Sequence, residues 1–133
     1  DFLSLHAALT PDNRGLLSEE RLRRMKRSAF LINTARGALV DETALARLLQ
    51  EGVIAGAALD AFVVEPLPLD HPLRSAPNVL LTPHFASCAR ETGERVSTTA
   101  AQAIVDLMQG RRPKFVVNPD VFNSPACRVK VPA

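Results

Sequence analysis

The sequence has few cysteines, no excess charge of one sign and no long apolar run. Its two cysteines, Cys88 and Cys127, form no C-x-x-C pattern, so neither a disulfide framework nor a zinc site is expected. Lys and Arg number 16 against 14 Asp and Glu, which leaves no single-sign field to attract nucleic-acid phosphates. Apolar stretches such as residues 55–59 are far shorter than the roughly 20 residues that cross a bilayer. No signal-peptide pattern opens the chain. We therefore expect a cytoplasmic protein that binds neither nucleic acid nor membranes.

Short apolar segments alternate with segments that have helical features. The apolar segments are residues 1–6, 29–33, 55–59 and 78–82. Between them, one helix is expected to open at the N-cap Ser18, and another at Asp41, ending at Gly52. A long helix follows from about Ser87 and stops at Gly110. Apolar strands without alternation, separated by helices, are typical of a parallel sheet covered on both faces. The predicted fold class is therefore α/β.

Charged side chains follow three of the predicted strands. Arg36 follows the second strand, Asp60 follows the third with Glu65 shortly beyond, and His84 follows the fourth. Open parallel sheets bind ligands at the carboxyl ends of their strands, so these side chains are expected at one edge. A guanidinium can grip a carboxylate with two hydrogen bonds, and Gly37 would permit close approach to a ligand. His84 can exchange a proton near neutral pH, and a nearby carboxylate would favour its imidazolium form.

Each of these residues also has a purely structural interpretation. Arg36 and Glu65 could be solvated surface residues, and His84 could be a loop histidine with its hydrogen bonds satisfied. Asp60 could cap the turn after its strand. The basic stretch 21–27 shares a short helix with two glutamates and has no interleaved aromatics, so a solvated face is preferred over phosphate contact.

Several motifs, taken together, resemble those of the D-isomer-specific 2-hydroxyacid dehydrogenases. In chain order they are Leu5-His6-Ala-Ala-Leu-Thr10, Asn33-Thr-Ala-Arg-Gly37 with Leu39-Val-Asp-Glu42, Ala58-Leu-Asp60 with Glu65-Pro66, and Thr82-Pro-His-Phe-Ala-Ser87. Their order and spacing also match, and the resemblance extends from residue 1 to about residue 119. Within the family, the chain is most similar to the phosphoglycerate, glyoxylate and hydroxypyruvate dehydrogenase branch.

The resemblance implies an NAD-dependent oxidoreductase that transfers hydride between nicotinamide and C2 of a small D-2-hydroxy acid or 2-oxo acid, with NADP as an alternative cofactor. It implies three catalytic residues. Arg36 would bind the carboxylate and carbonyl of the 2-oxo acid. His84 would be the general acid in reduction and the general base in oxidation, hydrogen-bonded to Glu65. No metal is implied, because Arg36 supplies the positive charge of a Lewis acid.

The resemblance also implies residues that bind the cofactor. Asp60 would anchor the nicotinamide carboxamide. The other residues lie on the loops after the strands, and they are His6, Thr10, Thr34, Ala35, Arg36, His84, Ala86 and Ser87.

The family's glycine-rich fingerprint is missing, because no pair of the chain's glycines forms G-x-G. We therefore expect the second half of a Rossmann-type parallel sheet with flanking helices. Residues 1–110 would be the C-terminal half of the NAD-binding domain, including its long final helix. Residues 111–133 would be an extended tail that returns to an absent substrate domain. The first strand would then form an open apolar edge.

The resemblance implies a homodimeric parent enzyme, and this chain alone is expected to bind NAD poorly, because the helix that carries the pyrophosphate is missing. Two other interpretations stay open. One is an NAD-sensing, corepressor-like binding module, and the other is an inactive truncated remnant.

Overall fold

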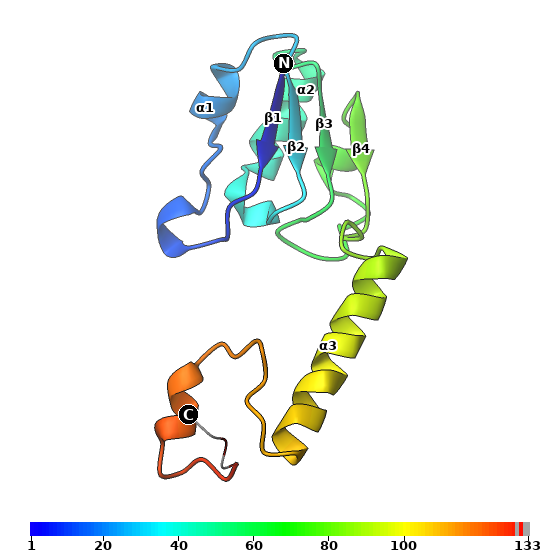
Figure 1. Ribbon diagram of the computed structural model, residues 1–133. Helices are drawn as coiled ribbons and strands as arrows, with labels where there is room; N and C mark the ends of the chain where they lie inside the picture. Colours follow the sequence, from blue (N-terminus) through cyan, green and yellow to red (C-terminus); the bar gives the residue numbers. More distant parts are fainter. Residues whose placement is uncertain (130, 132–133) are drawn as a thin grey trace. The chain divides into compact units, whose positions relative to one another are not determined.

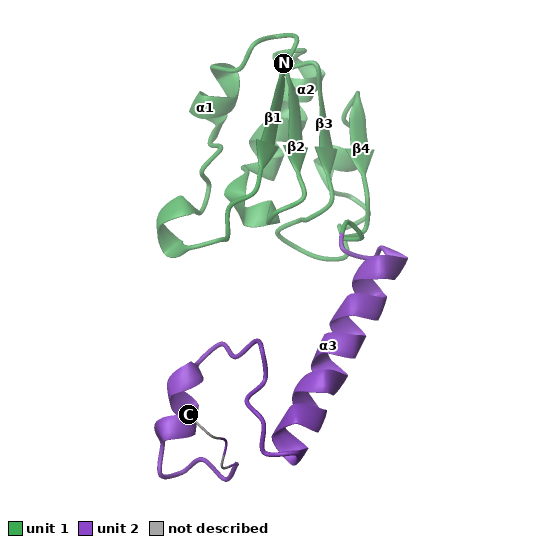
Figure 2. Cartoon of the chain, viewed as in Figure 1, with its two compact units in different colours: residues 1–86 green, residues 87–133 purple. Residues whose placement is uncertain are grey.

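A computed structural model describes residues 1–129 and 131 and divides the chain into two compact units (Figure 2). The first unit is Asp1–Ala86 and the second is Ser87–Ala133. The units therefore divide well before residue 110, where the sequence places the domain boundary. The assignment of the long helix to the nucleotide-binding domain stays a prediction.

The first unit contains a sheet of four parallel strands in the order β1-β2-β3-β4 (Figure 1). The strands are β1 (Phe2–Leu5), β2 (Phe30–Asn33), β3 (Gly56–Leu59) and β4 (Val79–Leu81). Each lies within a segment that the sequence predicts as a strand, so the α/β fold with a parallel sheet is confirmed. Because all strands run the same way, the loops that follow them emerge at one edge.

Short helices in the first unit begin at residues that cap them. Helix α1 (Glu19–Arg23) follows Ser18, whose hydroxyl accepts a hydrogen bond from the backbone N–H of Arg21 at 3.5 Å. Helix α2 (Glu42–Gln50) follows Asp41, whose carboxylate accepts from the N–H of Ala44 at 3.0 Å. Both caps are the predicted ones. The remaining helical turns of this unit are the 3-10 helices η1 (Pro11–Asn13), η2 (Gly37–Leu39) and η3 (Pro72–Arg74).

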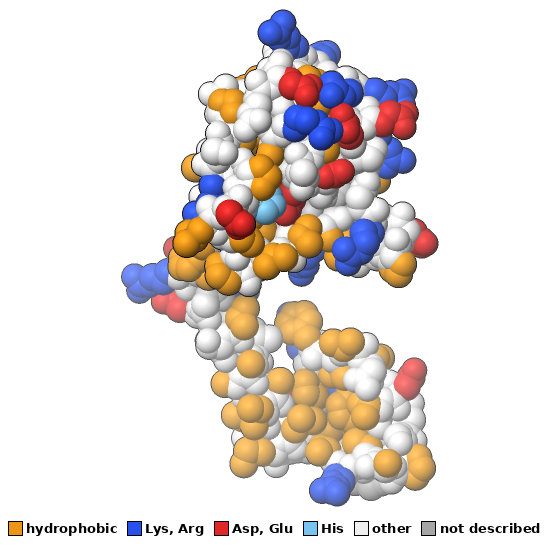
Figure 3. All heavy atoms as spheres, turned by 180° about the vertical axis from the view of Figure 1, so that it is seen from behind, with side chains coloured by type: hydrophobic (Ala, Val, Ile, Leu, Met, Phe, Trp, Pro, Cys, Tyr) orange, Lys and Arg blue, Asp and Glu red, His pale blue; other side chains and the backbone are white. Residues whose placement is uncertain are grey.

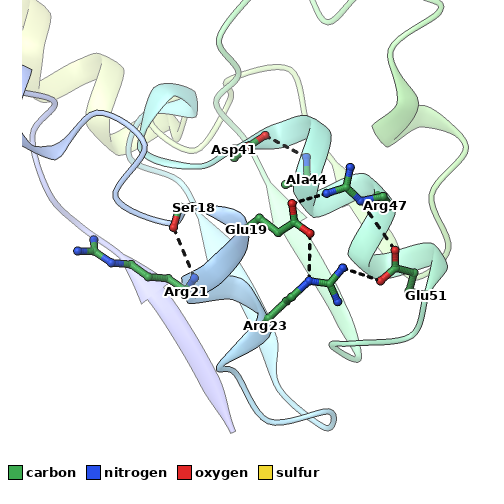
Figure 4. Close-up of polar contacts among 8 residues, drawn as sticks. All are labelled: Ser18, Glu19, Arg21, Arg23, Asp41, Ala44, Arg47 and Glu51. Atoms are coloured by element: carbon green, nitrogen blue, oxygen red, sulfur yellow. Dashed lines mark hydrogen bonds and ion pairs between the residues drawn. The ribbon is translucent and has the colours of Figure 1, made fainter.

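Ion pairs join α1 to α2 (Figure 4). Glu19 pairs with Arg23 of its own helix at 3.0 Å and with Arg47 of α2. Arg23 also reaches Glu51 at 3.0 Å. Hydrogen bonds from Arg47 and then from Arg23 hold the pKa of Glu19 below its ordinary value. Figure 3 shows acidic and basic side chains interspersed over this face of the first unit. At least part of the basic stretch is thus used within the fold.

Apolar side chains cover only one face of the sheet within the first unit. Leu31 of β2 and Leu59 of β3 are buried there in one cluster with Leu45 and Leu48 of α2. Successive right-handed crossovers in one direction along the sheet place α1 and α2 on the same side. Within this unit the other face is left bare, and Phe2 at its edge is 74% exposed. The expectation that both faces are covered stays a prediction.

The second unit contains the longest helix, α3 (Arg90–Met108), and a 3-10 helix, η4 (Pro119–Asn123). Helix α3 begins after Ala89 rather than at Ser87, and it ends before Gly110, as predicted. The expected extended tail therefore contains a short helical turn. Hydrophobic side chains gather on the surface of this unit (Figure 3). No helix in the part of the chain that the structure describes is long and apolar enough to cross a membrane.

Candidate active site

His84 and Glu65 are hydrogen-bonded to each other in the loops that follow β4 and β3. The Nδ1–H of His84 donates to the two carboxylate oxygens of Glu65 at 3.0 and 2.9 Å. The two side chains are 41% and 38% exposed, so both reach solvent. With Nδ1 bound to the carboxylate, Nε2 is the ring nitrogen that remains for proton exchange. The sequence-based expectation that these two residues meet is thus matched by the geometry.

The backbone of His84 adopts a conformation that few non-glycine residues take. Its φ of 57° lies in the left-handed region, a conformation that costs on the order of 1–3 kcal/mol and persists only where the surrounding structure holds it. The Asp60 carboxylate holds this conformation by binding residues that precede and follow His84 in the chain. Oδ1 of Asp60 accepts from the hydroxyl of Thr82 at 2.6 Å and from the N–H of Phe85 at 2.7 Å, and Oδ2 accepts from the N–H of Ala86 at 2.9 Å.

Asp60 is 3% exposed, yet it favours the ionised state. Burial alone would raise the pKa of its carboxyl, but the hydrogen bonds from Thr82, Phe85 and Ala86 outweigh burial and lower the pKa. Asp60 therefore organises the loop that carries His84. This role is close to the purely structural interpretation of Asp60 as a cap of the turn after its strand. Its contact with a nicotinamide carboxamide stays a prediction.

Glu65 is held by the backbone as well as by the imidazole. Its Oε1 accepts from the N–H of Phe62 at 2.9 Å. That hydrogen bond first, and the one from His84 second, lower the pKa of the Glu65 carboxyl. Glu65 therefore stays ionised as the negative partner of the imidazole.

A pocket of about 530 Å³ lies beside this pair. Its lining is mostly apolar, with Glu65, His84, Arg74 and Thr82 as the polar contributors. The other lining residues are Phe62, Pro66, Leu67, Leu81 and Pro83. A concave apolar pocket with a few convergent polar groups is the usual form of a small-molecule site.

Arg36 lines a different pocket, at the carboxyl ends of β1 and β2. This pocket measures about 280 Å³ and is formed by residues 5–8 and 34–36. It brings Arg36 together with His6, Thr34 and Ala35, all expected at the cofactor. The exposed guanidinium of Arg36 donates to the carbonyl of Ala35 at 2.6 Å. Arg36 and the His84–Glu65 pair thus share an edge of the sheet, but they do not line the same pocket.

Four residues expected at the cofactor line neither pocket, and they are Thr10, Asp60, Ala86 and Ser87. The backbone N–H of Thr10 donates to Asn13 at 2.8 Å, so Thr10 starts the turn η1. Ser87 belongs to the second unit. Their contact with a cofactor stays a prediction.

Gly37 serves a purpose that differs from the expected one. A Cβ atom at this position would overlap the backbone of Phe62 and Val63. Its lack of a side chain therefore lets η2 pack against the segment that leads to Glu65. The interpretation of Gly37 as making room for a ligand is wrong in this structure, because protein backbone occupies that space.

Sequence reasoning missed a second pair, Glu42 and His71. Glu42 is 8% exposed; its Oε1 accepts from the N–H of Val63 at 2.8 Å, and its Oε2 lies 3.5 Å from Nε2 of His71. An acidic residue in the first turn of a helix is explained by the helix dipole alone, so no local signal marks it as buried.

A model of the family described as D-isomer specific 2-hydroxyacid dehydrogenase, NAD binding domain, matches residues 1–86. The chain belongs to this family. The predicted resemblance to D-isomer specific 2-hydroxyacid dehydrogenases is thereby confirmed, and the match covers the whole first unit.

Relatives in this dehydrogenase family are much longer than the chain. The chain is 48% identical to a glyoxylate reductase of Thermofilum pendens over 122 residues, which are 92% of this chain and 36% of that protein. Among solved structures, a D-lactate dehydrogenase with NAD+ from Lactobacillus jensenii is similar with a TM-score of 0.81 and 32% identity, over 88% of this chain and 39% of that one. A D-isomer specific 2-hydroxyacid dehydrogenase from Xanthobacter autotrophicus, in complex with NADPH and MES, is similar with a TM-score of 0.70 and 43% identity. The similarity covers 88% of this chain and 46% of that one. The chain thus spans about a third of the length of the curated relatives it matches.

Proposed function

We propose that this chain is part of an NAD(P)-dependent D-2-hydroxyacid dehydrogenase that reduces a small 2-oxo acid such as glyoxylate or hydroxypyruvate. The observation that carries the proposal is the His84–Glu65 hydrogen bond beside the pocket at the sheet edge. Membership of the family supports it, as do the names of the relatives. No pair of the glycines forms the dinucleotide fingerprint, so the complete protein is needed for activity.

The pocket at the ends of β1 and β2 fits one part of a dinucleotide. Ala7, Ala8 and Ala35 contribute short side chains there, so a ligand can approach the backbone closely. The pocket lies where open parallel sheets bind nucleotides. His6, Thr34 and Arg36 supply its polar groups. When bound, NADH supplies the hydride, and NADPH is the alternative.

His84 would donate a proton from Nε2 to the oxygen of the 2-oxo acid during reduction and remove it during oxidation. Glu65 would keep Nδ1 protonated and stabilise the imidazolium form, which acid catalysis in the reductive direction requires. The left-handed backbone at His84, held by Asp60, would fix the direction in which the ring enters the site. Glu65 and Asp60 would thereby orient the proton on Nε2 of His84 before the substrate binds.

Arg36 would bind the carboxylate of the 2-oxo acid through two parallel hydrogen bonds. Its exposed guanidinium contacts the carbonyl of Ala35 and is free to turn toward a ligand. Substrate binding would then bridge the two pockets, with the carboxylate at Arg36 and the reacting oxygen at His84.

We also propose a cytoplasmic location and a homodimeric complete protein. Both cysteines are free thiols, which suits a reducing compartment. The family resemblance supports the homodimer, and the balanced charge argues against a nucleic-acid partner.

Turnover by the complete protein tests this function. Glyoxylate and hydroxypyruvate are supplied with NADH or NADPH, and consumption of the reduced cofactor is followed by its absorbance. His84→Gln keeps a hydrogen-bonding side chain but cannot act as an acid near neutral pH, so kcat should fall by roughly 10²- to 10⁴-fold while the Kd of NADH stays nearly constant. NADH binding without turnover in the wild type would favour the binding module. Absence of both would favour the inactive remnant.

A further inference from the structure

Glu42 is a buried carboxylate that the proposed mechanism does not use. It is the first residue of α2, but Asp41 already caps that helix through the N–H of Ala44. The side chain of Glu42 turns inward and is 8% exposed. Burying a carboxylate is costly unless its oxygens are hydrogen-bonded, so its partners indicate what it does.

The partners of Glu42 come from two other segments. Oε1 accepts from the N–H of Val63, in the loop after β3, at 2.8 Å. Oε2 faces His71, at the start of η3, with 3.5 Å between it and Nε2. Because Nδ1 of His71 accepts from the N–H of Leu73 at 3.3 Å, Nε2 is the nitrogen that carries the hydrogen toward Glu42.

The surroundings of Glu42 act on the pKa of its carboxyl in opposite directions, and the net effect raises it. Burial raises the pKa of its carboxyl, and the negative charge of Glu65 adds to that rise. The N–H of Val63 and the imidazole of His71 lower it. These are the charged and polar groups that face Glu42 from the segments packed against it. Two carboxylates therefore lie close to the same loop, one buried and one beside the pocket.

Consecutive backbone N–H groups of that loop are divided between the two carboxylates. The N–H of Phe62 donates to Glu65, and the N–H of Val63 donates to Glu42. Gly37 packs against the same two residues so closely that no Cβ would fit. The peptide between Phe62 and Val63 is thus held by hydrogen bonds and by a close backbone contact.

We propose that Glu42 is a positioning residue for catalysis: it holds the N–H of Val63 and thereby fixes the loop from which Glu65 reaches His84. The proposal rests on the proposed function and deepens it. If Val63 is released, the neighbouring Phe62 N–H no longer fixes Oε1 of Glu65. The carboxylate then moves relative to the imidazole, and the proton donor loses its orientation. Misplacements of about 1 Å near a reacting group can lower rates roughly 100-fold.

Two conservative substitutions in the complete protein distinguish two contributions of Glu42: the position of its acceptor oxygen near Val63 and its negative charge. Glu42→Gln keeps an acceptor oxygen at the same reach but removes the charge. Glu42→Asp keeps the charge but withdraws it by one methylene from Val63. The amide N–H₂ of E42Q would face the Nε2–H of His71, so this variant should be less stable than the wild type. Per folded molecule, we expect it to keep about a third or more of the wild-type kcat/KM for glyoxylate, with the same pH profile. We expect E42D to lose roughly 10- to 100-fold in kcat, with little change in the KM for NADH.

The pH profile is a readout that a general loss of stability would not move. In E42D the displaced Glu65 stabilises the imidazolium less, so reductive activity should be lost at a lower pH than in the wild type. Glu20→Gln, an exposed substitution on α1, is the control for removal of a carboxylate and should match the wild type. Equal losses in E42Q and E42D, or a wild-type rate and profile in E42D, would overturn the proposal.

A structural measurement keeps this test independent of turnover. In crystal structures of the complete protein, E42Q should retain the hydrogen bond between Nδ1 of His84 and Glu65, and E42D should lengthen that distance beyond 3.5 Å, the limit of a useful hydrogen bond. If the wild type turns over no 2-oxo acid, the proposed function fails, and these distances still decide whether Glu42 positions Glu65. An unchanged distance in E42D would refute it.

Discussion

The Nδ1–H of the His84 imidazole donates to both carboxylate oxygens of Glu65, which lies 19 positions earlier in the chain. Parallel strands make this contact possible, because β3 and β4 are neighbours and their following loops leave the same edge. The contact occupies Nδ1 and orients the ring. It therefore ties the sheet topology to the orientation of the proposed proton donor.

Replacing Glu65 by glutamine should show how much the negative charge contributes. Gln keeps an acceptor for Nδ1 but cannot stabilise the imidazolium, so we expect kcat for reduction to fall by roughly 100-fold in the complete protein. The hydrogen bonds from Phe62 and His84 lower the pKa of Glu65, so its charge persists at neutral pH and is lost only as pH falls below the ordinary range of a glutamate carboxyl. The difference between wild type and Glu65→Gln should accordingly persist at neutral pH and shrink in acid. Rates that differ equally at all pH values would contradict this role.

Replacing Arg36 should damage both substrate binding and rate. We expect Arg36→Ala to raise the KM for glyoxylate by roughly 10- to 100-fold and to lower kcat, because the guanidinium would bind the carboxylate and orient the carbonyl. Arg36→Lys should recover only part of the loss, since an ammonium group cannot form the two parallel hydrogen bonds. Steady-state kinetics check both variants. A wild-type KM in Arg36→Ala would show that another residue binds the carboxylate.

Asp60→Asn should lower the stability of the fold in a pH-dependent manner. The amide can place an N–H opposite the N–H of Ala86, which would leave buried donors facing each other and cost about 1–3 kcal/mol. Because the pKa of Asp60 is lowered by folding, the stability that its ionised form contributes is present above about pH 4 and lost as pH falls through the folded value. Urea unfolding should therefore show a difference between wild type and variant at pH 7 that narrows toward pH 3. A constant difference would be evidence against ionised Asp60 as the organiser of the loop.

Gly37→Ala should be costly although alanine is a small residue. The new Cβ would overlap the backbone of Phe62 and Val63, so η2 or the loop that leads to Glu65 must move. We expect a destabilisation of about 1–3 kcal/mol in urea unfolding, together with reduced kcat. Gly15→Ala is the matched control, because a Cβ at Gly15 meets no atom within 4 Å and only its positive φ is strained. It should lose stability without losing turnover per folded molecule.

Much of the fold could be predicted from local signals. Ser18 and Asp41 cap their helices as predicted, and each strand lies within an apolar run flanked by turn residues. The meeting of Glu65 and His84 also follows from topology, because both come after strands of a parallel sheet. These features depend on short-range patterns and on one general rule about sheet edges.

The remaining features depend on contacts between distant segments. Nothing near Gly37 in the sequence reveals that Phe62 packs against it, and nothing near Glu42 reveals that Val63 and His71 are its partners. The separation of Arg36 from His84 into two pockets likewise depends on loop paths that periodicity does not specify. The sequence therefore predicts which edge of the sheet brings these charged side chains together, but not how the loops there are held.

The chain of residues 1–133, studied alone, should self-associate through the edge of its sheet and the sheet face that helices of the first unit leave uncovered. Phe2 and Leu80 on that face are 74% and 63% exposed, and β1 is an edge strand with unpaired backbone groups. We expect sedimentation velocity to show species larger than the monomer that grow with concentration. Leu80→Lys should shift the distribution toward monomer, because it places a charge within the apolar face. Leu69→Lys is the control: Leu69 is 89% exposed but lies in the loop between β3 and β4, so the distribution should not change. A wild-type monomer with a cooperative thermal transition, or equal effects of both lysines, would show that this face does not drive association.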